Sequence, residues 1–223
     1  MKNVIITGGT GMVGGLVLKE CLDRDDVRSV TAVTRRKTGL VNPKLREIVH
    51  ENFLDYSEIG EYFREQDVGF YCIGVYSGSV PAGEFRTITV DYAKAFAEAL
   101  QSHSPHAAFC FLSGQGADST EKSRIPFARD KGKAENILLG LGFERIAIFR
   151  PGYIYPVTPR KEPNFGYRMM RVLYKPVISR LLPNAGIPSE DLAEAMVEIG
   201  LDGGGHVIYE NKDIRKFLID HKQ

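Results

Sequence analysis

Short apolar runs alternate along the chain with longer segments in which apolar residues recur every three or four positions. The short runs are rich in Val, Ile and Phe and are bounded by turn residues, which is typical of buried strands, and the longer segments are typical of amphipathic helices. The pattern predicts strands near residues 2–7, 29–34, 45–49, 68–73, 107–113 and 144–150. It predicts helices near residues 12–23, 56–64, 87–102 and 128–140. Strands and helices that alternate in this way indicate an α/β fold with a doubly wound parallel sheet.

The alternation changes after Arg150, Pro151 and Gly152, where prolines become frequent. Beyond this point the pattern predicts a broken helix, a second helix, a short strand and a terminal helix, over residues 164–182, 187–201, 205–209 and 213–220. Residues 151–223 are too few to fold independently, so we expect a single domain over residues 1–223. We expect this small C-terminal portion to cover a substrate cleft at the carboxyl ends of the strands. The first of its helices is basic and amphipathic, and a helix for a membrane surface or a protein partner is the alternative.

The first predicted strand leads directly into a glycine-rich turn, with Gly8, Gly11 and Gly14 at three-residue spacing. In a dinucleotide-binding turn the first glycine permits a tight bend, the second lets the backbone approach a pyrophosphate, and the third lets the next helix pack closely. The N-terminus of that helix directs free N–H groups toward the phosphates. The strand before the turn and the amphipathic helix after it favour a Rossmann-type cofactor site over a simple packing turn. The candidate cofactor-binding residues here are Gly8, Thr10, Gly11, Met12, Val13 and Gly14.

The second predicted strand is followed by Thr34, Arg35, Arg36 and Lys37. Proteins that bind NAD place a carboxylate near this position, where it accepts hydrogen bonds from the adenosine ribose. A carboxylate repels a 2′-phosphate, whereas the guanidinium groups of Arg35 and Arg36 can bind phosphate through paired N–H donors. The expected cofactor is therefore NADP(H). The alternative is that these cations form an ordinary solvated loop.

Composition and charge give expectations about partners, metal sites and cellular location. Of the 223 residues, 43% are hydrophobic and the net charge is +1, so the charge balance does not suggest a nucleic-acid partner. Three scattered cysteines, Cys21, Cys72 and Cys110, lie in apolar segments without metal-ligand spacing, which indicates a reducing compartment and no metal site. The chain opens on a strand-like run without a targeting pattern, and no apolar stretch is long enough to span a bilayer. We therefore expect a cytoplasmic protein with no membrane span.

Several motifs at the ends of the predicted strands occur together in one enzyme superfamily. They are Thr7-Gly8-x-x-Gly11-x-x-Gly14, Cys72-Ile73-Gly74, Leu112-Ser113 and Arg150-Pro151-Gly152. Through them the chain resembles the short-chain dehydrogenase/reductase superfamily, in its extended or atypical branch, over nearly its whole length. Segments 67–74, 113–118 and 131–135 are more specific, and through them the chain is most similar to the HIV Tat-interacting protein (CC3-like) group.

The resemblance implies roles for particular residues. It implies that Ser113 polarises a substrate carbonyl and that Lys131 holds the nicotinamide ribose. It adds Ile73, Gly74, Lys131, Pro151 and Gly152 to the expected cofactor contacts. Relatives carry a proton-donating tyrosine four residues before the lysine, but this chain has Phe127 there. Because phenylalanine has no hydroxyl, the expected chemistry lacks its usual general acid, a loss that typically slows a reaction about a hundredfold to ten-thousandfold.

The missing hydroxyl leaves two functions open. One is an NADPH-dependent oxidoreductase of low or unusual activity, whose proton comes from Ser113, from water, or from Tyr153 or Tyr155. The other is a non-catalytic NADP(H)-binding redox sensor or regulatory protein that acts through a protein partner. For the two catalytic candidates, the alternatives are a strand-end cap at Ser113 and a solvated helix residue at Lys131. The sequence does not identify the small-molecule substrate, and we expect a monomer or a homodimer.

Overall fold

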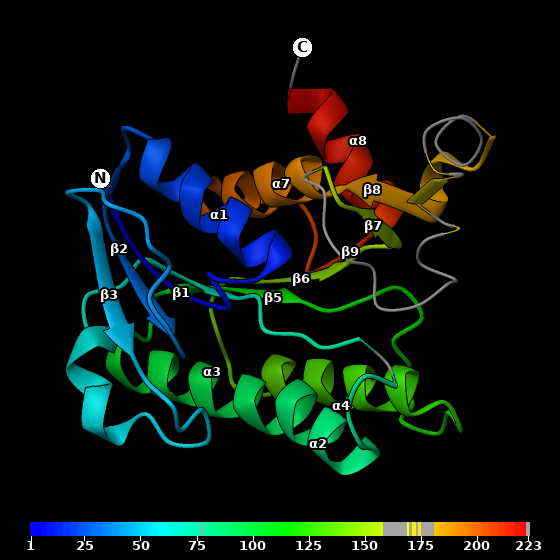
Figure 1. The fold of residues 1–223 in the computed structure, drawn as a ribbon, viewed down its shortest axis with the longest axis horizontal. Helices are drawn as coiled ribbons and strands as arrows, with labels where there is room; N and C mark the ends of the chain where they lie inside the picture. The colour runs from blue at the N-terminus through cyan, green and yellow to red at the C-terminus, as the bar shows by residue number, and fades with distance from the viewer. Residues whose placement is uncertain (77, 158–168, 170, 173, 175–180, 222–223) are drawn as a thin grey trace.

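A seven-stranded sheet forms the centre of the computed structural model, which describes residues 1–76, 78–157, 169, 171–172, 174 and 181–221. Its order is β3-β2-β1-β4-β5-β6-β9, and every neighbouring pair of strands is parallel. The strands are β1 (Lys2–Thr7), β2 (Val27–Thr34), β3 (Leu45–Val49), β4 (Val68–Tyr71), β5 (Ala108–Leu112), β6 (Ile146–Arg150) and β9 (Ile208–Glu210). The predicted α/β class and doubly wound parallel sheet are confirmed (Figure 1).

Helices cover both faces of this sheet (Figure 1). One face carries α1 (Met12–Asp23), α7 (Ser189–Asp202) and α8 (Asn211–His221). The other carries α2 (Ala82–Arg86), α3 (Tyr92–His103) and α4 (Pro126–Leu139). Strands buried on both faces need apolar side chains at successive positions, which is why they read as continuous apolar runs. On β1, Val4 and Ile6 pack toward α1 and α7, whereas Ile5 packs in the opposite core with residues of α3 and α4.

The long helix expected over residues 87–102 is interrupted at its start. It is built from α2, a π-helical segment η2 (Thr87–Asp91) and α3 in succession. The fully buried Tyr71 of β4 donates a hydrogen bond from its hydroxyl to the Ile88 carbonyl O at 3.0 Å. A side chain that occupies a helix carbonyl disturbs the regular ladder of hydrogen bonds, which accounts for the wider turn at this point.

The prediction of a regular α-helix over residues 56–64 is wrong. The segment is a 3₁₀ helix, η1 (Ser57–Phe63), whose backbone leaves helical angles at Ile59, with φ −119° and ψ 17°. The next residue, Gly60, lies so close to α3 that a Cβ there would be 2.9 Å from Nε2 of His103. A glycine lowers helix propensity, and here it also permits the close approach to α3.

The C-terminal portion adds a second, two-stranded parallel sheet, in which β7 (Tyr153–Tyr155) pairs with β8 (Gly186–Pro188). A short 3₁₀ helix, η4 (Pro183–Ala185), directly precedes β8. The helix expected from residue 187 begins instead at Ser189, because Pro188 favours an extended conformation for the residue before it. The expected late strand and terminal helix correspond to β9 and α8. Most of the segment 164–182, where a broken helix is expected, lies outside the described residues.

Candidate functional site

The glycine turn connects the carboxyl end of β1 to the N-terminus of α1. Gly8 has φ +83°, and a Cβ there would lie 2.6 Å from the Cys72 carbonyl carbon, so no other residue fits without displacing backbone. A Cβ on Gly14 would lie 2.2 Å from the Gly8 carbonyl O, which means that α1 packs directly against the turn. No side chain caps α1 at Gly11, so the N–H groups of its first turn can bind an anion. The turn therefore has the shape and the donors that a pyrophosphate needs.

Ile73 and Gly74, two further expected cofactor contacts, directly follow β4 beside this turn. The Ile73 backbone N would lie 2.8 Å from a Cβ on Gly8. A Cβ on Gly74 would meet no atom within 4 Å, so its backbone borders open space. The structure thus brings the ends of β1 and β4 together at one edge of the sheet, where ligands bind in folds of this kind.

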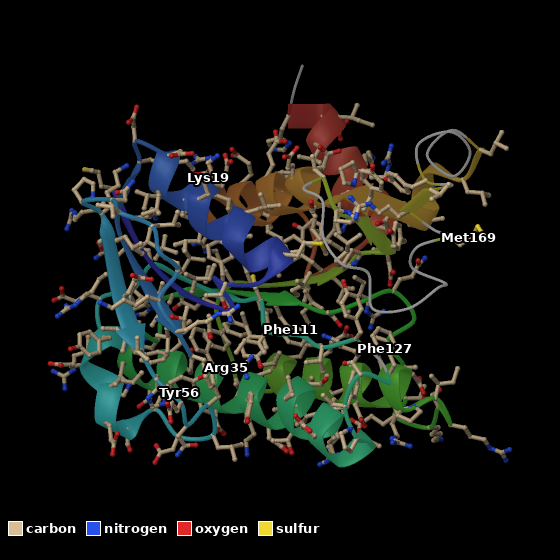
Figure 2. All side chains as sticks on the ribbon, in the orientation of Figure 1. Lys19, Arg35, Tyr56, Phe111, Phe127 and Met169 are labelled. Carbon is tan, nitrogen blue, oxygen red and sulfur yellow. The ribbon has the colours of Figure 1, made fainter. Side chains whose placement is uncertain are left out.

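Arg35 and Arg36 follow β2, and both are exposed. The Thr34 hydroxyl donates a hydrogen bond to the Arg36 carbonyl O at 2.8 Å, and the Thr7 hydroxyl of β1 donates one to the Val33 carbonyl O at 3.0 Å. These bonds hold the start of the arginine loop next to the end of β1 (Figure 2, where Arg35 is labelled). The two guanidinium groups therefore extend into solvent from the strand beside the glycine turn.

Ser113 directly follows β5, and its hydroxyl donates a hydrogen bond to Oε1 of Glu135 on α4. Glu135 is 0% exposed. Arg150, at the end of β6, donates from Nε to Oε1 of Glu135 at 3.0 Å and forms an ion pair with Oε2. Arg150 also contacts Glu210 at 2.9 Å and Ser119 at 3.0 Å. The hydrogen bonds to Glu135 raise the pKa of Arg150, so the guanidinium is charged.

Lys131 lies one helical turn before Glu135 on α4, and its side chain reaches the end of β5. Its Nζ donates a hydrogen bond to the Leu112 carbonyl O at 3.1 Å and lies 5.1 Å from the centre of the Phe111 ring. Burial lowers the pKa of Lys131 to about 8, against the opposing effect of the Glu135 carboxylate. The structure therefore brings both catalytic candidates, Ser113 and Lys131, to the end of one strand.

Phe127 is at the beginning of α4, four residues before Lys131 (labelled in Figure 2). Its Cζ atom lies 2.7 Å from the position that a Cβ on Gly114 would occupy, so the tip of the ring contacts the backbone next to Ser113. The Phe85 ring is 6.3 Å away, centre to centre. An apolar pair thus borders the polar groups at the end of β5.

The remaining candidates lie after β6. Pro151 accepts a hydrogen bond from the Gln115 N–H at 2.9 Å, and the Gly152 N–H donates one to Oδ1 of Asn211 at 2.9 Å. The Gly152 N–H is therefore engaged within the protein. Tyr153 and Tyr155 are on β7 in the second sheet, and their rings lie 5.8 Å and 4.7 Å from the ring of Tyr174.

Sequence reasoning missed the role of Glu135 and its link to Arg150. The available signal was positional, because Glu135 follows Lys131 by one helical turn on a helix whose buried residues include Ala134 and Leu138. An acidic residue among buried positions indicates a partner of opposite charge. That partner is on a different strand, so the sequence alone did not identify it.

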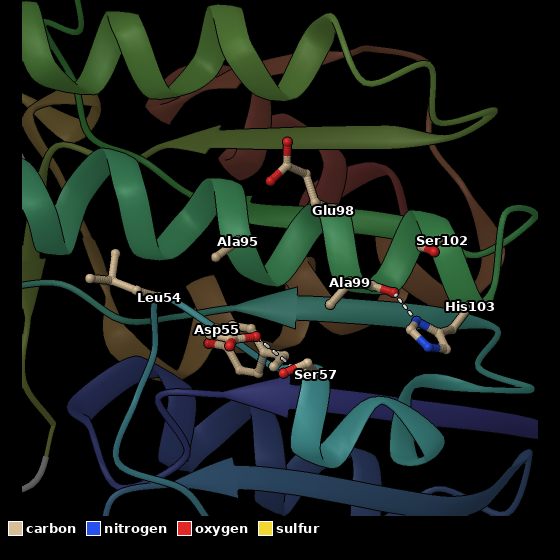
Figure 3. A pocket seen from close by; sticks show the side chains of 9 residues that line it. Leu54, Asp55, Ser57, Ala95, Glu98, Ala99, Ser102 and His103 are labelled. Carbon is tan, nitrogen blue, oxygen red and sulfur yellow. Dashed lines mark hydrogen bonds between the residues drawn. The ribbon is translucent and has the colours of Figure 1, made fainter.

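A separate pocket of about 260 Å³ lies between the segment after β3 and the outer side of α3 (Figure 3). Leu54, Asp55 and Ser57 line one side, and Glu98 and His103 line the other. Nδ1 of His103 is 2.9 Å from the Ala99 carbonyl O, within the same helix. The lining includes none of the residues that the sequence singled out for cofactor or catalysis.

Comparison with known proteins agrees with this geometry. Residues 4–135 match the family described as NAD dependent epimerase/dehydratase. The chain is 28% identical to Protein HTATIP2 of Rattus norvegicus over 218 residues, which cover 96% of this chain and 88% of the relative. It is 28% identical over 165 residues to "Protein FMP52, mitochondrial" of Candida albicans, covering 72% of this chain and 69% of that protein.

Two solved structures share the fold at low identity. A short chain dehydrogenase from Burkholderia cenocepacia in complex with NADP has a TM-score of 0.66 and 18% identity, covering 100% of this chain and 94% of its own. The Bordetella bronchiseptica enzyme WbmH in complex with NAD+ has a TM-score of 0.68 and 18% identity, and the match covers 100% of this chain and 81% of that enzyme. Among the described residues, no helix has the length and apolarity to cross a membrane.

Proposed function

Since this chain belongs to the NAD dependent epimerase/dehydratase family, we propose that it binds NADP(H) and acts as an NADPH-dependent oxidoreductase of low or unusual activity. The observation that carries the proposal is the turn from Gly8 to Gly14, which leaves the N-terminus of α1 without a side-chain cap at the edge of the sheet. The exposed guanidinium groups of Arg35 and Arg36 support the phosphorylated cofactor. A carboxylate at this position would instead support NAD.

The residues present fit such a cofactor. The bend at Gly8 leaves room for no side chain, and the donors at the start of α1 suit a pyrophosphate. When bound, NADPH supplies a hydride to a carbonyl carbon. Lys131 supplies a buried cation near the end of β5, with donors left over from its bond to Leu112 for a ribose or a carbonyl oxygen. Ile73 and Gly74 complete the proposed cofactor contacts, together with Pro151 and Gly152, which would contact the cofactor while the Pro151 carbonyl and the Gly152 N–H stay bonded to Gln115 and Asn211.

Phe127 lowers the expected rate without removing binding. The Ser113 hydroxyl proton is engaged by Glu135, so the proton that a tyrosine would supply comes from Lys131, from water, or from Tyr153 or Tyr155. Lys131 is the best placed of these, because its pKa of about 8 keeps most of it protonated near neutral pH while leaving it acidic enough to donate.

The cofactor assignment is tested by calorimetry with NADPH and NADH. We expect the unmodified protein to bind NADPH more tightly. Gly11→Ala places a methyl group only 3.0 Å from the Gly8 carbonyl O, where backbone must approach the pyrophosphate, and should weaken binding about tenfold or more. Gly15→Ala is the matched control. It lies one helical turn after Gly11, its Cβ would be 3.3 Å from the Gly9 carbonyl O, and this variant should bind NADPH normally. Failure of the unmodified protein to bind either nucleotide overturns the proposal.

A non-catalytic redox sensor is the second candidate, and two observations favour it. The tyrosine position holds an apolar ring, and the Ser113 hydroxyl proton is already engaged by Glu135. This candidate predicts tight NADPH binding without NADPH oxidation across a broad carbonyl panel, and a protein partner whose affinity changes with saturating NADPH. A partner that binds equally with and without NADPH counts against it.

A further inference from the structure

The Ser113 hydroxyl, Glu135 and Arg150 form one hydrogen-bonded chain at the end of β5. We propose that Glu135 is a positioning residue that fixes the Ser113 hydroxyl as a hydrogen-bond acceptor toward the ligand, so that this site selects a secondary alcohol over the matching ketone. The inference rests on the proposed function in one respect, because it takes the ligand to bind beside the end of β5. It reverses the role that the family resemblance implies for Ser113, which is donation to a carbonyl. A site that holds the alcohol more tightly than the ketone slows reduction by NADPH, in line with the low activity proposed above.

The first step is the proton count at Ser113. A serine hydroxyl has one proton to donate and two lone pairs that accept. The structure assigns that proton to Oε1 of Glu135. Only lone pairs then remain for a ligand, and a lone pair attracts an O–H group and repels a carbonyl oxygen.

The second step is the ion pair between Glu135 and Arg150. Oε1 accepts from Nε of Arg150 at 3.0 Å as well as from Ser113, and Nε is also 3.2 Å from Oε2. Nη2 of Arg150 donates to Oε2 as well. Both oxygens thus accept from the guanidinium of Arg150, and in this ion pair Glu135 serves as an acceptor only. It therefore cannot return a hydrogen bond to Ser113.

The third step is the rigidity of the arrangement. Arg150 is held from its other side by Glu210 at 2.9 Å and Ser119 at 3.0 Å, and its side chain is 12% exposed. If Ser113 turned away, a fully buried carboxylate oxygen would lose one of its donors, which is costly in a low-dielectric interior. The orientation of the hydroxyl is thus set by the protein before a ligand arrives.

Lys131 completes the pattern that a ligand meets. Its ammonium has three protons, one of which bonds the Leu112 carbonyl. The site therefore presents an acceptor at Ser113, donors at Lys131 and the apolar ring of Phe127. A secondary alcohol can donate its proton to Ser113 and accept from Lys131, whereas a ketone can only accept.

Infrared difference spectra test the orientation without any ligand. Ser113→Ala removes one donor from Glu135 and leaves the Arg150 pair in place, so we expect a shift in an ionised carboxylate band relative to the unmodified protein. The same substitution made in Glu135→Gln should give no such shift. A change in the protonated carboxyl region, or no change at all, overturns the proposal. NADPH titration of the unmodified protein reports separately on the proposed function.

Ligand binding tests the consequence. Cyclohexanol is titrated into the NADPH complex and cyclohexanone into the NADP⁺ complex, so that neither pair can react. We expect the alcohol to bind about tenfold more tightly, the value of one hydrogen bond. In Glu135→Gln one of the two oxygens becomes an NH₂ group, which faces an N–H donor of Arg150 in either orientation, so the ion pair that fixes the Ser113 hydroxyl is lost and the preference for the alcohol should disappear. A merely structural role for Glu135 predicts equal weakening of both ligands. Equal weakening of both ligands in Glu135→Gln overturns the inference. So do equal affinities for the two ligands, or binding of neither, in the unmodified protein.

Discussion

The tip of the Phe127 ring contacts the backbone of Gly114, the residue that follows Ser113. A Cβ on Gly114 would lie only 2.7 Å from Cζ of Phe127, so glycine is what allows the ring to lie over this strand end. Cζ is also the atom that carries the hydroxyl in tyrosine. The chain therefore keeps the ring of the family's proton donor beside Ser113 and lacks only its oxygen.

Phe127→Tyr should restore that oxygen beside Ser113, with the ring drawn back slightly from the Gly114 backbone that its tip contacts. We expect the rate of NADPH oxidation with a panel of carbonyl compounds to rise by up to about a hundredfold, the lower range for a positioned general acid. Phe127→Leu, which keeps the site apolar, is the control and should give no gain. If neither the unmodified protein nor Phe127→Tyr oxidises NADPH with any compound of the panel, the oxidoreductase proposal is wrong and the sensor remains.

The local pattern of apolar residues in the sequence was sufficient to predict most of the strands of the sheet. The β1 strand, the glycine turn and α1 follow one another in sequence, so spacing alone predicted the bend at Gly8 and the close packing at Gly14. The six strands predicted before residue 151 all occur, with bounds that differ by about two residues. Their continuous apolar runs reflect burial on both faces of the sheet, and such a run can be recognised within a single strand.

Features made by distant residues were not predictable in this way. The π-helical segment at Thr87–Asp91 depends on a hydrogen bond from Tyr71, which comes from another strand. The chain from Ser113 through Glu135 to Arg150 joins β5, α4 and β6. No periodicity within one element encodes such contacts. The cytoplasmic location likewise stays a prediction, and the matched fungal relative is named mitochondrial.

Arg35→Ala and Arg36→Ala should each weaken NADPH binding by about tenfold, because each removes charge-assisted hydrogen bonds to the 2′-phosphate. NADH affinity should hardly change, since NADH lacks that phosphate. The double substitution should erase most of the preference for NADPH in calorimetric titrations. Arg28→Ala removes another exposed cation, near the opposite end of β2, and should leave both affinities unchanged. Equal binding of NADPH and NADH by the unmodified protein would contradict the phosphate assignment.

Gly132→Ala should destabilise the fold by about 2 kcal/mol or more, in the range of overpacked cores. A Cβ at this position of α4 would lie 1.8 Å from the Asp118 carbonyl O, so the helix and the loop after β5 would have to separate. Gly140→Ala is the matched control at the end of the same helix, where the nearest atom would be 3.4 Å away and the backbone has φ −76°. That change should be neutral or stabilising by up to about 1 kcal/mol in urea unfolding. Similar losses for the two variants would show that the Asp118 contact is not the cause.

Stability should rise with pH above neutrality through Lys131. Its folded pKa of about 8 lies below its ordinary value of 10.5, so below pH 8 both states hold the proton and the folded state bears the full cost of a buried charge. Between these two values the folded protein releases the proton while the unfolded chain keeps it, and the free energy of unfolding increases with pH. From pH 7.5 to 9.5 we expect a gain of about 2 kcal/mol in urea unfolding. Lys131→Met should remove that gain, and Lys133→Met, on a partly buried neighbour, should retain it. An unchanged pH dependence in Lys131→Met would contradict the burial of a titrating ammonium at the end of β5.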